Sequence, residues 1–95
     1  LITQKIIYNM VVETNFEIEF AKVYPNFTKD LIQRCNNLTY TEVKICMYLK
    51  MNFSNKQILE YMEISDSTLS NLRSSIRKKL NIKRKQGIFS TITII

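Results

Sequence analysis

The sequence predicts a small all-α domain, a helical bundle, from its turn residues, its helix starts and its apolar spacing. Connections between β-strands usually need glycine, Asn-Gly or proline, whereas this 95-residue chain contains only Gly87 and Pro25. Helices joined by short polar turns need few such residues. The apolar share of 45% fits one folded domain of this length.

Three helix starts have the same spacing of apolar and hydroxyl residues. Thr39 with Glu42, and Ser54 with Gln57, have the spacing of a capping box, in which each side chain satisfies the other residue's backbone amide. Ser65 begins a third unit, and in all three an apolar residue precedes the hydroxyl residue and another follows it four positions later. These units predict helices over residues 40–50, 55–62 and 66–80.

Apolar residues recur at helical spacing within each of these segments. The three stripes consist of Ile45, Cys46 and Leu49, then Ile58, Tyr61 and Met62, then Leu69, Leu72, Ile76 and Leu80. Only about three residues connect the second helix to the longer third helix. A short helix, a tight turn and a longer helix are the parts of a helix-turn-helix, which is therefore the predicted motif.

Two further helices are predicted ahead of this motif. Thr14 and Glu17 have the spacing of a helix start, and Pro25 ends the helix that they open. Asn26 is expected to cap a following helix that reaches about residue 34. The residues expected on the inward faces are Phe16, Phe20, Val23, Phe27 and Leu31. Both helices are therefore expected to contribute to the core and not to a site.

Residue types that several catalytic sites require are missing. The chain has no histidine, so it cannot form a Ser-His or Cys-His pair or a histidine-ligated metal site. One glycine is too few for a dinucleotide fingerprint or a P-loop. Cys35 and Cys46 are predicted to be reduced core thiols, although in a secreted protein they could form a disulfide. We expect a cytoplasmic protein with no enzyme activity, no cofactor and no metal, and with no apolar run near 18 residues that would span a membrane.

The positive charge of the chain is concentrated in its last third. Residues 1–64 contain seven Lys/Arg and seven Asp/Glu, whereas residues 65–95 contain seven Lys/Arg and only Asp66, which accounts for the whole net charge of +6. A solvated basic face would explain this distribution. A segment that binds a polyanion would explain it equally, since clustered cations gain affinity by releasing counterions from phosphates.

The outward face of segment 66–80 follows from a rotation of about 100° per residue. Opposite its apolar stripe lie four short polar residues and one cation, namely Ser67, Ser70, Asn71, Ser74 and Lys78, with Arg77 and Asn81 on a flank. Short hydrogen-bonding side chains followed by cations suit a helix whose N-terminal half enters a major groove. A plain polar surface would be more stable with Glu, Lys or Ala, so the pattern favours DNA recognition.

Four pieces of the chain together resemble the LuxR/GerE-type DNA-binding domain. They are Leu38-Thr39-x-x-Glu42-x-x-Ile45, Phe53-Ser54-Asn55-Lys56-Gln57-Ile58, Ile64-Ser65-x-x-Thr68-Leu69 and Ile76-Arg77-Lys78-Lys79-Leu80. Their order and spacing match over about residues 38–82. Upstream, the apolar pattern from Phe16 to Leu31 resembles the helical lead-in of bacterial regulators that carry tetratricopeptide repeats before this domain.

The resemblance implies a four-helix DNA-binding domain that acts as a dimer on two half-sites of double-stranded DNA. We expect residues 37–95 to form this output domain of a bacterial transcriptional regulator, with residues 1–36 as a lead-in from a longer protein that carries a sensor or repeat domain. The expected base-facing residues are Ser67, Ser70, Asn71 and Ser74. The expected phosphate contacts are Asn55, Lys56, Thr68, Arg77, Lys78 and Lys79.

Two departures from the family pattern affect these expectations. Leu59 stands where the family usually has alanine, which implies a wider or differently angled crossing of the two motif helices. Ser70 and Ser74 stand where several members have lysine. Base readout is therefore expected to be weaker, water-mediated or dependent on DNA deformation.

The tail after Gly87 allows two interpretations. The resemblance implies a fourth helix, often at a dimer interface, whereas the β-branched alternation of residues 91–95 favours an extended segment. As a helix, the tail would place Ile88, Ile92 and Ile95 on one side, and these are the expected dimer residues.

Another class of function also fits the composition. A helical protein-interaction or oligomerisation module, with basic residues serving solubility, is the alternative to DNA binding. A promoter-binding domain like those of sigma factors is a closer variant of the same prediction.

Overall fold

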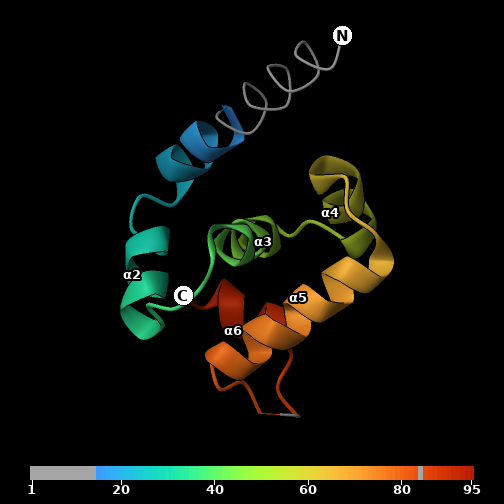
Figure 1. Ribbon diagram of the computed structural model, residues 1–95. Helices are drawn as coiled ribbons and strands as arrows, with labels where there is room; N and C mark the ends of the chain where they lie inside the picture. The colour runs from blue at the N-terminus through green and yellow to red at the C-terminus, as the bar shows by residue number, and fades with distance from the viewer. Residues whose placement is uncertain (1–14, 84) are drawn as a thin grey trace, which may run out of the picture.

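The computed structural model describes residues 15–83 and 85–95, and all the regular structure within these ranges is helical (Figure 1). A helix of residues 15–23 is followed by α2 (Phe27–Arg34), α3 (Tyr40–Lys50), α4 (Asn55–Met62), α5 (Asp66–Lys79) and α6 (Ile88–Thr93). The predicted all-α class is therefore confirmed. Thr14, the expected first cap, lies outside the described residues.

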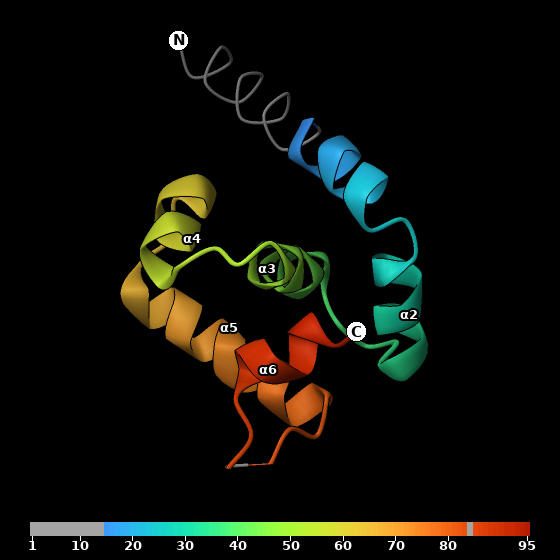
Figure 2. The same cartoon turned by 180° about the vertical axis from the view of Figure 1, so that it is seen from behind.

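Helix α3 is the central element, with α2 on one side and α4, α5 and α6 on the others (Figures 1 and 2). Seven of its 11 residues are buried, so it contacts neighbours almost all around its axis. The predicted stripe of Ile45, Cys46 and Leu49 is at most 2% exposed. Both cysteines are free and buried, as expected for core thiols.

The helix starts of α3, α4 and α5 lie at the predicted residues because local hydrogen bonds define them. Thr39 with Glu42 and Ser54 with Gln57 form complete capping boxes. The Ser65 hydroxyl accepts from the Thr68 amide, 3.2 Å away. Helix α5 ends at Lys79, one residue earlier than predicted, because the chain leaves helical geometry at Leu80 and Asn81.

Left-handed residues follow each of these three helices. Asn52, Glu63 and Asn81 have φ angles of 64°, 55° and 56°. Asparagine tolerates this conformation better than most residues because its short amide can hydrogen-bond locally. All three helices thus end without the glycine that is common at this position, and at two of them asparagine takes its place.

Two of the residues predicted to face the core are exposed. Val23 is 57% exposed because it is the last residue of its helix, and Tyr24 packs against the core in its place. Tyr61 is 55% exposed, and its ring contacts the core at the rings of Tyr48 and Phe53, whose centroids are 6.1 Å and 5.5 Å away. The other predicted inward residues of the first two helices are buried or partly buried.

Side chains of residues 15–34 fill part of the core beside α3. Phe20, Phe27 and Leu31 are at most 3% exposed. Phe16 stacks on Tyr48 of α3 with ring centroids 4.4 Å apart. The helix of residues 15–23 therefore packs on α3 through buried aromatic rings.

The tail forms helix α6, which confirms the helical interpretation, and it lies against α3 (Figure 2). Ile88 and Ile92 are 3% and 0% exposed, so they belong to the core and do not form the surface expected for dimerisation. An apolar stripe of this spacing fits the interior of the domain as well as it fits a partner. The exposed apolar residues of this end are Phe89 and Ile94, while Ile95 is partly buried.

None of the helices in the described part of the chain is long and apolar enough to cross a membrane. Within residues 15–83 and 85–95 there is also no group of three or more Cys, Asp or Glu residues placed to hold a metal ion.

Candidate nucleic-acid interface

Helices α4 and α5 and the turn between them form the predicted helix-turn-helix. Helix α4 ends at Met62, and the left-handed conformation of Glu63 redirects the chain. Ser65 then caps α5, so three residues make the whole turn. This geometry places the start of α5 at one corner of the molecule, away from α2 (Figure 1).

Helix α5 has an anchored face and an exposed face. Leu69 and Ile76 are 3% and 0% exposed and hold the helix on the core, and Leu72 and Leu80 are partly buried. The predicted outward residues are all exposed, namely Ser67, Ser70, Asn71, Ser74 and Lys78. The orientation of α5 predicted from its helical periodicity is therefore confirmed.

A network of hydroxyl groups orders the first turn of α5. The Ser65 hydroxyl lies 2.9 Å from the Thr68 hydroxyl and 3.2 Å from the Ser67 hydroxyl. Thr68 and Ser67 are both exposed, so their hydroxyls remain open to solvent on one side. The turn that would enter a groove first is therefore ordered by its own side chains.

Cations gather at the other end of α5. Ser74, Arg77, Lys78, Asn81 and Ile82 line an open hollow at this end. The Arg77 guanidinium donates a hydrogen bond to the Lys83 carbonyl at 3.0 Å, which joins the helix to the following loop. Lys78 is exposed. The hollow therefore has two cations and the amide and hydroxyl groups that suit an anionic ligand.

The amino end of α4 is connected to α5 by an arginine. Arg73 donates a hydrogen bond to Asn55 Oδ1 at 3.1 Å. Burial, together with the positive charge of Arg77, lowers the pKa of Arg73 from its ordinary value. Lys56, the next residue after Asn55, is exposed. The predicted α4 residues thus lie at the start of that helix, where they are linked to the middle of α5.

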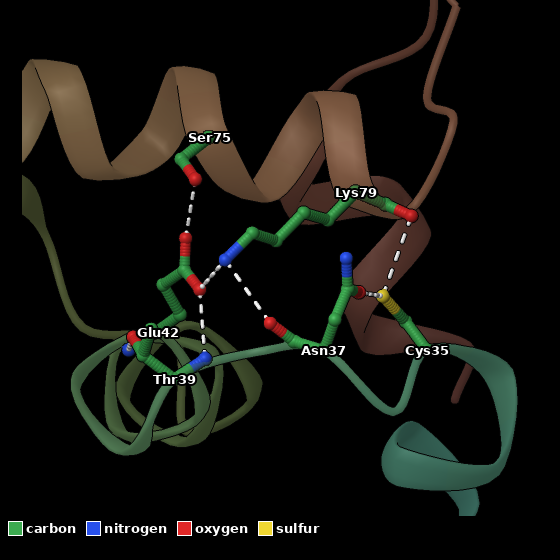
Figure 3. Close-up of polar contacts among 6 residues, drawn as sticks. All are labelled: Cys35, Asn37, Thr39, Glu42, Ser75 and Lys79. Carbon is green, nitrogen blue, oxygen red and sulfur yellow. Dashed lines mark hydrogen bonds and ion pairs between the residues drawn. The ribbon is translucent and has the colours of Figure 1, made fainter.

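Lys79 occupies a different environment from the other predicted phosphate contacts. Its ammonium lies 2.7 Å from Glu42 Oε1 and donates to the Asn37 carbonyl at 3.1 Å (Figure 3). The ammonium is therefore directed toward α3 and not toward the exposed face. Lys79 is therefore placed to join α5 to α3 and not to contact a phosphate beside the exposed face.

Glu42 is the centre of a polar cluster that joins α3 to α5 (Figure 3). Its carboxylate is 2% exposed and accepts hydrogen bonds from the Ser75 hydroxyl at 2.5 Å, from Lys79 and from the Thr39 amide at 2.8 Å. Burial alone would raise its pKa, but the hydrogen bonds from Lys79, Ser75 and Thr39 outweigh burial and lower the pKa from 4.5 to about 2. Glu42 thus stays charged and fixes α5 from its inner side.

The sequence predicts neither this cluster nor the Arg73–Asn55 bond. It indicates Glu42 only as the partner of Thr39 in the capping box. The sequence contains one indication of the cluster: Ser75 and Lys79 are four residues apart, so they share one side of α5. That spacing does not say which residue of α3 they meet.

The family model described as GerE, bacterial regulatory proteins of the luxR family, matches residues 36–91. This match covers more than half of the chain and includes helices α3 to α5 and most of α6. No curated protein and no solved structure matched the chain.

Proposed function

This chain belongs to the luxR family of bacterial regulatory proteins, and we propose that it binds double-stranded DNA sequence-specifically, with α5 in the major groove. The observation that most directly supports this proposal is that α5 has one buried face and one exposed polar face. A helix whose inner side is fixed by apolar residues and by Glu42 can present its outer side to base edges without reorienting.

The proposed contacts fall into two groups. Base edges would be contacted by the outward-facing residues among the first nine of α5, which are Ser67, Ser70, Asn71 and Ser74. Phosphates would be contacted by Asn55 and Lys56 at the start of α4, by Thr68, and by Arg77 and Lys78 at the end of α5. Phosphate contacts supply most of the affinity and fix the register, whereas base contacts give the specificity.

We further propose that two copies bind two half-sites about one helical turn apart. One domain offers a single recognition helix, which reaches only a few base pairs and gives modest specificity. The surface available for pairing at the end of the chain is that of Phe89 and Ile94, which are 41% and 76% exposed. Two exposed side chains per copy make a contact far smaller than the standard interface of roughly 1,600 Å². Two copies are therefore expected to pair when bound to DNA and not in free solution.

In this proposal the domain is the DNA-binding output of a cytoplasmic transcription regulator, under the control of a sensor or repeat domain elsewhere in the protein. It has no catalytic function of its own. The residues 15–34 would connect the two parts.

The test is the salt dependence of binding to a duplex of mixed sequence, measured by fluorescence anisotropy. The slope of log K against log salt should be steep, and Lys78→Ala should reduce it by about 0.9, the value for one lost phosphate contact. Lys29→Ala is the matched control, because Lys29 is an exposed cation on α2. Absence of salt-dependent binding would contradict the proposal, as would equal slopes for both variants.

A further inference from the structure

We propose that the base read by this domain is adenine, through the side-chain amide of Asn71, with one fixed adenine in each half-site. This inference rests on the proposed function, because it concerns what α5 recognises once it lies in the groove. It also narrows the four expected base-facing residues to one that discriminates.

The outward face of the first nine residues of α5 is chemically simple. It contains three serines, Ser67, Ser70 and Ser74, together with Asn71. A serine hydroxyl can donate or accept, so it contacts different bases with little preference. Only the Asn71 amide combines a donor and an acceptor in one plane. Discrimination between bases therefore depends on this residue.

The amide of Asn71 matches one base edge. In the major groove adenine presents the N7 acceptor beside the N6 amino donor, so an asparagine amide can donate to the first and accept from the second. Guanine presents two acceptors, N7 and O6, and the amide oxygen would face O6 without a proton between them. The same side chain thus favours adenine and disfavours guanine.

Asn71 is also available for this contact. It lies in the second turn of α5, within about 35° of the centre of the outward face. Its side chain is exposed, and the structure shows no hydrogen bond from it to any residue in the described ranges. The ordered first turn and the buried Leu69 hold its backbone in place.

The side chains that usually read guanine are engaged elsewhere on α5. Arg73 is bonded to Asn55, and Arg77 to the Lys83 carbonyl. Lys79 is directed toward Glu42, as described above. Lys78 shares the outward face but lies seven residues beyond Asn71, which is roughly 10 Å along the helix. Among the residues of α5, the one cation within a helical turn of Asn71 is therefore Arg73, and its guanidinium is bonded to Asn55.

Asp66, which could accept from the amino group of cytosine, lies about 100° from the centre of the outward face. Thr68 is also off this face, and its hydroxyl is bonded to Ser65. The positions of Asp66 and Thr68 therefore exclude both residues from specific base contacts. Adenine is the base whose edge matches the exposed Asn71 amide.

The experiment is a selection of bound duplexes from random DNA with the full 95-residue chain, repeated with Asn71→Ala and with Gln33→Ala. Gln33 is the matched control, because it is an exposed side-chain amide on α2, outside the proposed interface. We expect one fixed adenine per half-site for the wild type and for Gln33→Ala, and loss of that adenine for Asn71→Ala. Both residues are exposed, so neither substitution disturbs the core.

A second measurement removes the acceptor from the DNA instead. Replacing the selected adenine by 7-deazaadenine removes one of the two hydrogen bonds of a bidentate contact. It should weaken wild-type binding several-fold, within the upper limit of about a hundredfold for the whole contact, and should leave binding by Asn71→Ala unchanged. A fixed guanine or cytosine in place of adenine, or an adenine that Asn71→Ala still selects, would overturn this inference while the salt-dependent binding stands. No binding to any duplex would overturn the proposed function itself, and the inference with it.

Discussion

Protonation of the buried Glu42 should remove a defined part of the stability of this domain. The carboxylate is 2% exposed and accepts from Ser75, Lys79 and Thr39, and these bonds hold its pKa at about 2 against an ordinary value of 4.5. Since the pKa is lower in the folded chain, the charged form stabilises the fold above pH 4.5, and this contribution is lost as the pH falls toward 2.

The size of the effect follows from the shift. A difference of 2.5 between the ordinary value of 4.5 and the folded value of about 2 corresponds to about 3 kcal/mol at pH 7, with 1.36 kcal/mol for each unit. About 2 kcal/mol of this should already be lost at pH 3, where the unfolded chain binds the proton and the folded chain still resists it.

The assay is urea unfolding at pH 7 and pH 3 for the wild type and for Glu42→Gln, which cannot titrate. At pH 7 the variant should be less stable by about 3 kcal/mol, since Lys79 loses its charged partner. Its loss of stability between pH 7 and pH 3 should be about 2 kcal/mol smaller than that of the wild type. Glu60→Gln is the matched control, because Glu60 is exposed on α4. If Glu42→Gln and the wild type lose the same free energy on acidification, the cluster does not stabilise the fold as argued.

Three further predictions follow from the packing. Ser54→Ala should lower the free energy of unfolding by roughly 0.5–2 kcal/mol because the helix cap is lost. Ile76→Ala should lower it by roughly 2–5 kcal/mol because a cavity opens under α5. Negligible losses for both variants in urea unfolding would reject the assignment of α4 and α5. Burial, together with the neighbouring Glu42 and Cys35, raises the pKa of the Cys46 thiol to about 12. A thiol reagent at pH 8 should therefore modify Cys46 only after the chain unfolds. Reaction of Cys46 in the folded chain at the rate of a free thiol would contradict this prediction. Ile94→Ser should weaken cooperative filling of two half-sites in a gel-shift titration and leave single-site affinity unchanged; unchanged cooperativity would place the pairing surface elsewhere.

Features that depend on residues close in the sequence could be predicted, and features that depend on tertiary contacts could not. The caps of α3, α4 and α5 each join residues three apart, so their positions follow from the order of residues alone. The hydrogen bonds that Ser75 and Lys79 donate to Glu42 join residues 33 and 37 apart in the sequence, and they exist only because α5 packs across α3.

The exposed face of the candidate site was predictable for the same reason. The periodicity of α5 fixes which side chains point away from Leu69 and Ile76. The periodicity of α6 gives its apolar side equally well, but it does not say whether that side meets the core or another molecule. The helical conformation predicted for Ile88 and Ile92 is therefore correct, but the neighbours predicted for them are wrong.

The packing of residues 15–34 has a consequence for anyone who exchanges DNA-binding units between regulators. The family match begins at residue 36, yet Phe20, Phe27 and Leu31 are buried in the same core as α3. The Lys44 ammonium of α3, whose side chain is 3% exposed, also lies 3.8 Å from Glu17. A chimaera joined at residue 36 would leave aromatic cavities and a buried lysine without that carboxylate. A workable junction therefore lies ahead of residue 15, so that the graft carries its own covering helices with it.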